Sequence, residues 1–316
     1  MKFRTIDLFA GCGGMSTGFT AAGFNVVAAY EYWTKAAEVY RKNLKHEVYN
    51  MDLSEVEEAV EHMRQFSPEV IIGGPPCQDF SSAGKRVENE RASLTEDFAT
   101  IIKEIHPIAF VMENVDRAKN SVSYSKARSQ FKESGYGLTE IVLDSSLCGA
   151  PQKRKRFFCI GVLGEEDGFL EGLLQENLSS KRMTMREYFG EKLNLDYYYR
   201  HPRNYSRRGV FSMDEPSPTI RGVNRPVPKG YPGHPNDPVN KVEDLRPLTT
   251  VERAMVQTFP DNYVWEGTKT DLEQMIGNAV PVNLAKYVAK HLGGYLDERR
   301  ARYRGLEELD YGNEAV

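Results

Sequence analysis

The stretch Phe3-Arg-Thr-Ile-Asp-Leu-Phe-Ala-Gly-Cys-Gly-Gly14 joins an apolar run directly to a glycine-rich turn. We expect residues 3–9 to form a buried strand, because short apolar runs that end in a turn are typical of strands. Residues 15–22 then predict the start of a helix. Glycines between a first strand and a first helix let a ligand approach the backbone closely. The turn lacks the full Gly-x-Gly-x-x-Gly spacing, so a nucleotide site and a plain structural turn remain equally open.

Strands and helices continue to alternate after this turn. Apolar runs typical of strands lie at Val26–Tyr30, 46–52, 70–72, 108–112 and 157–162. Helical spacing of apolar residues covers 33–44 and 54–65, and Ser54 is the expected N-cap of the second helix. This alternation predicts an α/β fold with a mostly parallel sheet that is covered on both faces.

The second half of the chain has a different pattern. Residues 196–240 show little periodicity and are rich in Pro, Gly, Tyr and Arg. This stretch is too long for a simple connecting loop in a compact domain. Helical patterning resumes near Thr250 and covers Val282–Leu292. We therefore predict one domain from residues 1–165 and 270–316, and a smaller irregular domain from residues 166–269.

The charge is unevenly distributed along the 316 residues. The net charge of −4 does not indicate a nucleic-acid partner for the chain as a whole. Residues 200–230, however, hold seven Arg and Lys against Asp214 and Glu215, with tyrosines and Phe211 interspersed. Such a mixture of cations and aromatic rings is the expected footprint of a nucleic-acid surface.

The four cysteines, Cys12, Cys77, Cys148 and Cys159, show no metal-binding spacing, so we expect no zinc site. Few, scattered cysteines indicate a reducing compartment. Asp7 interrupts the first apolar run, which excludes a signal peptide, and no stretch approaches the roughly 20 apolar residues of a membrane span. We expect a cytoplasmic protein.

Acidic residues follow the second and third predicted strands. Glu31 lies where a carboxylate binds a ribose diol, and Asp52 is placed to accept from an adenine amino group. Two acids without a phosphate-binding turn favour a nucleoside cofactor over a dinucleotide.

Residues 73–81, Gly-Gly-Pro-Pro-Cys-Gln-Asp-Phe-Ser, follow the fourth strand. The two prolines stiffen the chain, and Cys77 comes to the sheet edge where open α/β proteins bind ligands. A thiolate there is a candidate nucleophile. A buried structural cysteine is the commoner fate of a lone thiol, and we assign that role to the other three.

Two further groups are expected near Cys77. Glu113 ends the adjacent strand, and a half-buried carboxylic acid can donate a hydrogen bond to a ring nitrogen. In Gln152-Lys-Arg154-Lys-Arg156, strand alternation places Gln152, Arg154 and Arg156 on one face. That face either lines the site or is an ordinary solvated basic run.

Together these blocks resemble the DNA (cytosine-5)-methyltransferases of bacterial restriction–modification systems, over nearly the whole chain. The resemblance implies a Rossmann-like methyltransferase sheet, a smaller target-recognition domain and S-adenosylmethionine as the cofactor. It makes Cys77 the nucleophile, with Glu113, Gln152, Arg154 and Arg156 as its catalytic partners. The implied cofactor-binding residues are Phe9, Gly11, Gly13, Gly14, Glu31, Tyr32, Asp52, Leu53, Pro75, Asn278 and Val280.

The implied substrate is a cytosine flipped out of double-stranded DNA, bound by a monomer that needs no metal and no membrane. The expected DNA contacts are Gln78, Ser81, Arg86, Arg207, Arg208, Thr219, Arg221, Asn224 and Arg225. Arg221, Asn224 and Arg225 are candidate base-edge readers, and the alternative that the arginines touch only phosphates is equally open.

Three other functions were weighed. A tRNA cytosine-5 methyltransferase of the same fold is disfavoured because its usual Cys-Phe-Thr signature is absent. Intact Cys77 and Glu113 argue against a catalytically dead DNA-binding module. The incomplete glycine spacing argues against a nicotinamide oxidoreductase. The lack of regulatory extensions predicts a stand-alone modification enzyme.

Overall fold

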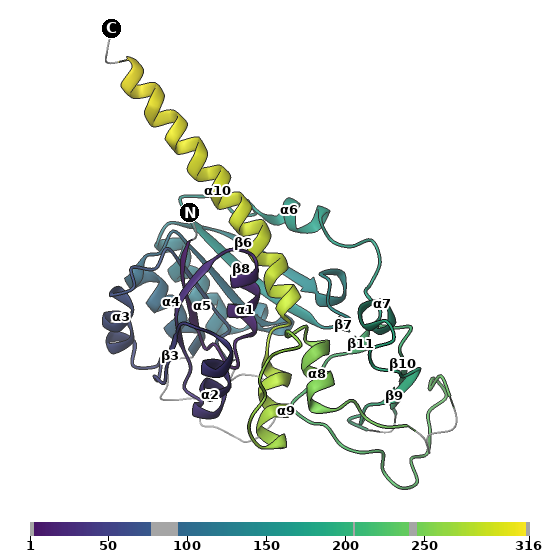
Figure 1. The fold of residues 1–316 in the computed structure, drawn as a ribbon. Helices are drawn as coiled ribbons and strands as arrows, with labels where there is room; N and C mark the ends of the chain where they lie inside the picture. The colour runs from purple at the N-terminus through teal and green to yellow at the C-terminus, as the bar shows by residue number, and fades with distance from the viewer. Residues whose placement is uncertain (1–2, 77–93, 205, 240–244, 314–316) are drawn as a thin grey trace.

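In the computed structural model of the chain, residues 3–76, 94–204, 206–239 and 245–313 are described (Figure 1). A seven-stranded sheet runs through these residues in the order β3-β2-β1-β4-β5-β8-β6. Its strands are β3 (Glu47–Tyr49), β2 (Asn25–Tyr30), β1 (Arg4–Leu8), β4 (Val70–Gly73), β5 (Ala109–Val115), β8 (Lys155–Leu163) and β6 (Tyr136–Asp144). The first five are parallel, and β8 is antiparallel to both of its neighbours. The predicted α/β class is confirmed.

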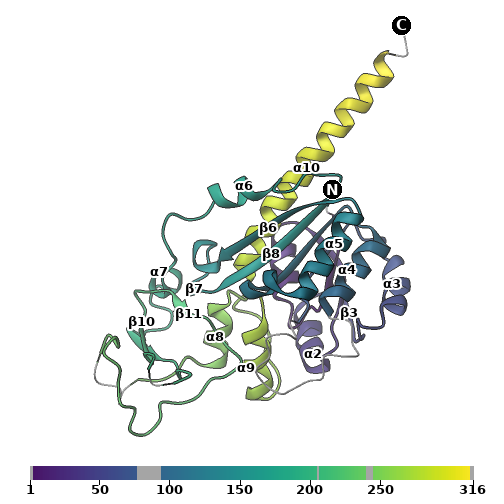
Figure 2. The same ribbon diagram turned by 180° about the vertical axis from the view of Figure 1, so that it is seen from behind.

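Helices cover both faces of the sheet (Figures 1 and 2). On one face lie α1 (Gly14–Ala21) and α10 (Val282–Asn313), and on the other lie α3 (Val56–Arg64), α4 (Leu94–Ile105) and α5 (Val122–Glu133). Residues of β4 alternate between the two cores: Val70 and Ile72 pack with α1 and α10, whereas Ile71 packs with α4. The two-residue period of a strand explains why β4 is apolar without interruption.

The irregular region pairs with the segment just before β8 through a separate two-stranded parallel sheet, β7 (Gln152–Lys153) with β11 (Ser217–Pro218). Beyond it lie a small hairpin, β9 (Tyr197–Tyr199) with β10 (Val210–Ser212), and the helices α7 (Met185–Phe189), α8 (Thr250–Val256) and α9 (Lys269–Asn278). Their apolar residues form one core with Ala36 and Val39 of α2 (Thr34–Asn43). The predicted domain boundaries at 165 and 270 stay a prediction.

One local expectation was wrong, and one helix was not predicted. Ser54 does not cap α3, because its hydroxyl donates to Asp52 Oδ1 at 2.7 Å and the helix begins later, with Glu55 at the N-cap. The helix α9 was not expected at all. The pattern over 282–292 was confirmed, but α10 continues to Asn313 and extends beyond the sheet (Figure 2). Among the described helices, none combines the length and apolar character needed to cross a membrane.

Candidate active site

A cavity of about 760 Å³ lies at the carboxyl ends of β1, β2, β4 and β5. Open α/β sheets bind ligands at this edge, next to the point where the strand order reverses. Ten of the eleven cofactor-binding candidates line it: Phe9, Gly11, Gly14, Glu31, Tyr32, Asp52, Leu53, Pro75, Asn278 and Val280. Three catalytic candidates, Glu113, Arg154 and Arg156, line it as well. The cavity thus brings together residues from both ends of the chain.

The glycine turn is shaped by close packing. A Cβ on Gly14 would lie 2.4 Å from the carbonyl oxygen of Val280, so only glycine fits where α1 meets the segment after α9. Gly13 has a φ of 91°, and a Cβ there would lie 2.8 Å from Tyr263 Oη. Gly13, the eleventh candidate, packs against Tyr263 and is not among the residues that line the cavity.

Glu31 is held at the cavity wall by two backbone donors. Its Oε2 accepts from the N–H of Gly11 at 2.7 Å, and its Oε1 accepts from the N–H of Trp33 at 2.7 Å. Burial raises the pKa of Glu31, and these two hydrogen bonds oppose the shift. Each carboxylate oxygen keeps a second acceptor site. The neighbouring Tyr32 is 73% exposed at the cavity rim, where its ring is free to stack on a ligand.

Asp7 is a cavity residue that the sequence analysis did not single out. Its Oδ2 accepts from the hydroxyl of Ser16 at 2.6 Å, whereas its buried Oδ1 has no hydrogen-bond partner among the described residues. Burial raises the pKa of the Asp7 carboxyl to about 7, with the Ser16 hydrogen bonds opposing the shift. An acid inside an apolar strand, four residues before the first glycine of the turn, was the available signal.

Glu113 projects from β5 and is only 7% exposed. Its Oε1 forms an ion pair with Arg156 Nε of the adjacent β8 at 2.8 Å. Burial raises the pKa of Glu113, while the charges of Arg156 and Arg154 oppose the shift. A Cβ on Gly74 would lie 3.1 Å from Glu113 Oε2, so the segment after β4 passes directly over this carboxyl group.

The segment that leads to the candidate nucleophile is fixed to the same strand. Asn114 Nδ2 donates to the carbonyl oxygen of Pro75 at 3.0 Å, and Pro76 lines the cavity. Cys77 follows immediately but lies outside the described residues, as do the DNA-contact candidates Gln78, Ser81 and Arg86.

Gln152 and Arg154 are buried beneath the cavity, as the predicted alternation requires. Gln152 Oε1 accepts from the N–H of Ile220 at 2.8 Å, and Arg154 Nη1 donates to the carbonyl oxygen of Ile220 at 2.9 Å. Arg154 Nη2 donates to the carbonyl oxygens of Gly277 at 3.0 Å and Ala279 at 3.1 Å. These two side chains therefore tie the irregular region and the end of α9 to β7 and the start of β8.

A second cavity of about 500 Å³ adjoins the first and shares Arg154 and Arg156 with it. Three DNA-contact candidates, Thr219, Arg221 and Arg225, line this second cavity together with His201 and Arg203. Its walls are strongly basic, as an anion site requires.

The other DNA-contact candidates lie elsewhere. Arg207 is exposed, and Arg208 forms an ion pair with Glu215 and stacks over the Phe211 ring at 4.3 Å. Asn224 Nδ2 donates to the carbonyl oxygen of Leu248 at 2.8 Å and to Glu273 Oε1 at 2.9 Å. These bonds turn the Asn224 amide toward the protein interior, so we do not retain it as a base reader.

Cys12, Cys148 and Cys159 are free and buried, as expected for structural cysteines, and burial raises the pKa of each thiol to about 12. No group of three or more His, Cys, Asp or Glu side chains within the described ranges is placed to hold a metal ion.

Comparison with known proteins identifies the family of the chain. Residues 3–294 match the family described as C-5 cytosine-specific DNA methylase. The Type II methyltransferase M.HindV of Haemophilus influenzae is 57% identical over 288 residues, covering 90% of this chain and 95% of that protein. The Type II methyltransferase M.HgiDI of Herpetosiphon aurantiacus is 53% identical over 304 residues, covering 96% and 98% respectively.

Solved structures agree at the level of the fold. The S. pombe Dnmt2 methyltransferase has a TM-score of 0.69 at 19% identity and covers 94% of this chain and 99% of its own. A putative DNA modification methyltransferase from an E. coli prophage has a TM-score of 0.69 at 22% identity and covers 94% and 100%. With a family match over residues 3–294 and two full-length relatives above half identity, the chain belongs to the C-5 cytosine-specific DNA methylases and is a DNA (cytosine-5-)-methyltransferase.

Proposed function

We propose that this enzyme takes its methyl group from S-adenosylmethionine and acts on a cytosine flipped out of double-stranded DNA, through a covalent bond to Cys77. The observation that carries the proposal is Glu113, a buried acid paired with Arg156 in the cavity that also holds Glu31. An acid beside a nucleoside-type site is what attack on a pyrimidine requires. The names of the two full-length relatives, both Type II methyltransferases, support a role in a restriction–modification system.

The cavity fits S-adenosylmethionine by its donor and acceptor chemistry. The cofactor's ribose hydroxyls, adenine amino group and ammonium group are all donors, and Glu31, Asp52 and Asp7 offer carboxylate oxygens around the cavity. Asp7 Oδ1, which has no hydrogen-bond partner in the part of the chain that the structure describes, is our candidate acceptor for one of these donors. Tyr32 and Phe9 supply aromatic surface for the adenine. When bound, the cofactor supplies a methyl group activated by a sulfonium charge.

The residues of the chain then act on the cytosine ring. The Cys77 thiolate forms a bond to C6, and the electron pair displaced from the C5–C6 bond makes C5 nucleophilic. Glu113 donates a hydrogen bond to N3, where negative charge develops, and Arg156 holds its carboxyl group in place. After C5 has taken the methyl group, a base removes its proton and Cys77 leaves as thiolate. Gln152 and Arg154 position the surrounding backbone.

Three finer assignments complete the proposal, and the chemistry of the reaction bears on the metal requirement. We propose that the enzyme works as a monomer in the cytoplasm and needs no metal ion, since thiolate attack and methyl transfer use none. A reducing compartment keeps Cys77 as a thiol.

Cofactor choice is tested by ligand-induced stabilisation. We expect S-adenosylhomocysteine at about a hundredfold excess over Kd to add about 2.7 kcal/mol of stability, or about 5 °C in Tm, and NAD to add nothing. Tyr32→Ala should reduce the shift by removing the stacking surface, whereas Tyr188→Ala, which lies outside the cavity lining, should not. Equal stabilisation by NAD would exclude the assignment.

The covalent step is tested with DNA in which the target cytosine carries fluorine at C5. Methylation of that ring leaves no C5 proton to remove, so Cys77 cannot be released. We expect an enzyme–DNA adduct that survives a denaturing gel and requires S-adenosylmethionine. Methylation of ordinary DNA without any adduct on the fluorinated DNA would contradict covalent catalysis.

A further inference from the structure

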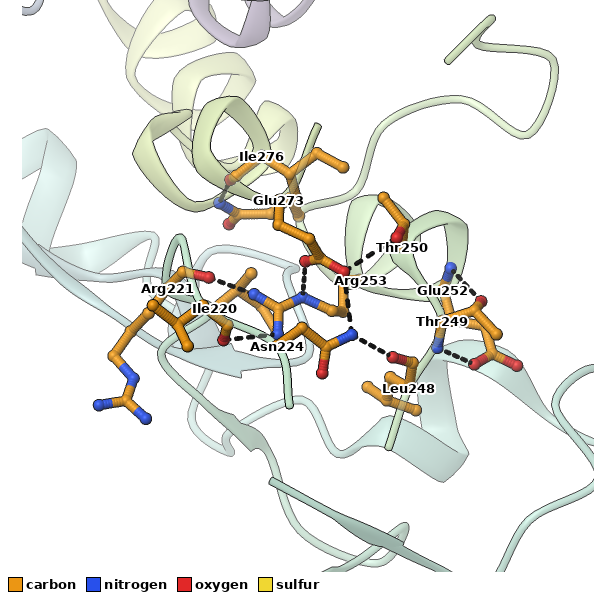
Figure 3. Close-up of polar contacts among 12 residues, drawn as sticks. Ile220, Arg221, Asn224, Leu248, Thr249, Thr250, Glu252, Arg253, Glu273 and Ile276 are labelled. Carbon is orange, nitrogen blue, oxygen red and sulfur yellow. Dashed lines mark hydrogen bonds and ion pairs between the residues drawn. The ribbon is translucent and has the colours of Figure 1, made fainter. Parts of the chain in front are cut away.

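The loop 219–225 lies over a buried ion pair between the helices α8 and α9 (Figure 3). Arg253 of α8 and Glu273 of α9 meet at 2.6 Å between Nε and Oε2, with side chains 6% and 3% exposed. Burying both charges costs desolvation free energy, so such a pair is poor evidence for stability alone. Its other contacts indicate what it is used for.

Nearly every remaining polar atom of the pair binds this loop. Arg253 donates from Nη1 to the carbonyl oxygen of Val223 at 3.2 Å and from Nη2 to the carbonyl oxygen of Arg221. Glu273 Oε1 accepts from Asn224 Nδ2 at 2.9 Å and from the hydroxyl of Thr250 at 2.9 Å. The pair therefore fixes the backbone at both Arg221 and Val223 and the side chain of Asn224.

The loop also contacts α9 through its backbone. A Cβ on Gly277 would lie 2.3 Å from the backbone nitrogen of Gly222, and a Cβ on Gly222 would lie 2.3 Å from Gln274 Oε1. Two glycines thus let the loop lie directly on the helix. The carbonyl oxygen of the same Gly277 accepts a hydrogen bond from Arg154, so Gly277 contacts both the loop and a residue of the active-site cavity.

Because the backbone of the loop is fixed, few of its side chains remain available to contact a ligand in the second cavity. Arg221 also lines the second cavity, but its guanidinium points away from Arg253 and its Nη2 donates to the carbonyl oxygen of His201 at 2.6 Å, which holds the side chain against the protein (Figure 3). Asn224 is bound to Glu273 and Leu248. Val223, 49% exposed, and Arg225, also exposed, face the second cavity beside Arg156.

We infer that the buried Arg253–Glu273 pair is a positioning device for sequence recognition, which holds the loop so that Val223 and Arg225 are the side chains presented to DNA bases. The inference rests on the proposed action on double-stranded DNA. An exposed valine suits the methyl group of thymine, and an arginine suits guanine. Arg253 and Glu273 touch no DNA themselves.

The test measures sequence selectivity, since a ratio of kcat/KM values is independent of how much enzyme is folded. The recognition sequence is first identified by bisulfite sequencing of DNA from cells that express the enzyme. Selectivity is then the ratio of kcat/KM on that sequence to kcat/KM on each duplex with one base pair changed. One base pair is typically worth about 1–3 kcal/mol, or roughly 5- to 150-fold.

Arg253→Lys keeps the charge but replaces the planar fork, whose three nitrogens reach Glu273 and two carbonyl groups from separate positions, by a single nitrogen atom. Glu273→Gln places an amide donor beside the guanidinium. We expect both variants to lose about tenfold or more of the selectivity at one or two base pairs, the same ones at which Val223→Ala and Arg225→Ala lose theirs. Arg299→Lys is the matched control, because Arg299 also forms an ion pair, with Glu165 at 3.0 Å, and binds a carbonyl oxygen, that of Leu163 at 2.7 Å. It should keep the wild-type selectivity.

If Arg253→Lys and Glu273→Gln lower Tm but leave every ratio unchanged, the pair is structural only and the inference is overturned. Selectivity losses at base pairs other than those affected by Val223→Ala and Arg225→Ala would overturn it as well. Should Arg253→Lys fail to fold, Glu273→Gln carries the same test alone. Failure of the proposed function is distinguishable, because wild-type enzyme would then form no adduct with fluorinated DNA.

Discussion

Cys77→Ser is expected to abolish methylation, with a loss on the order of 10⁴-fold or more, because the route through a covalent intermediate disappears. A serine hydroxyl is far less acidic than a thiol and is not ionised near neutral pH, so it does not attack C6. The measurement is transfer of labelled methyl groups to DNA that contains the recognition sequence. Adduct formation with fluorinated DNA should vanish in parallel.

Two controls separate loss of the nucleophile from loss of the fold. DNA binding and the Tm shift with S-adenosylhomocysteine should both persist in Cys77→Ser, since the cofactor candidates lie elsewhere in the cavity. Cys148→Ala removes a buried thiol that is not among the cavity residues and should retain activity per folded molecule. Substantial methylation by Cys77→Ser would exclude Cys77 as the nucleophile.

The sheet was predictable because its signals are local. Each of β1, β2, β4 and β5 is a short, mainly apolar run with a glycine or an acid at or close to its carboxyl end, so a window of ten residues suffices to recognise it. The helix α9 was not predicted because Glu273 occupies a core-facing position at which the helical pattern requires an apolar residue. Its partner, Arg253, lies twenty positions earlier on another helix, beyond the reach of periodicity.

The candidate site also has one part that the sequence predicts and one part that it does not. Glu31 and Asp52 follow strands and Glu113 lies near the carboxyl end of β5, and the order of strands alone brings them to one cavity. The sequence could not indicate which of these side chains bind residues far away in the chain instead of facing the site. The Gln152 side chain binds Ile220, sixty-eight residues away, and Gln257, and the Asn224 amide donates to Leu248 and Glu273. Only the folded chain distinguishes a side chain that faces DNA from one that holds the loop.

Glu113→Ala is expected to lower kcat by about 10²–10³, the usual cost of removing one donor to a developing anion. Glu113→Gln should lose less, because its amide still donates a hydrogen bond. The two variants also differ from wild type in pH dependence. Only the protonated acid donates to N3, so wild-type kcat should fall as pH rises through the pKa of Glu113, which burial raises.

That falling limb should be absent from the kcat profile of Glu113→Gln, whose side chain does not titrate. Arg156→Gln supplies the opposite control: the positive charge that opposes the burial effect on Glu113 is gone, so the limb should move to higher pH. If Glu113→Gln keeps the falling limb unchanged, another group donates the hydrogen bond to N3, and the buried pair with Arg156 only shapes the cavity.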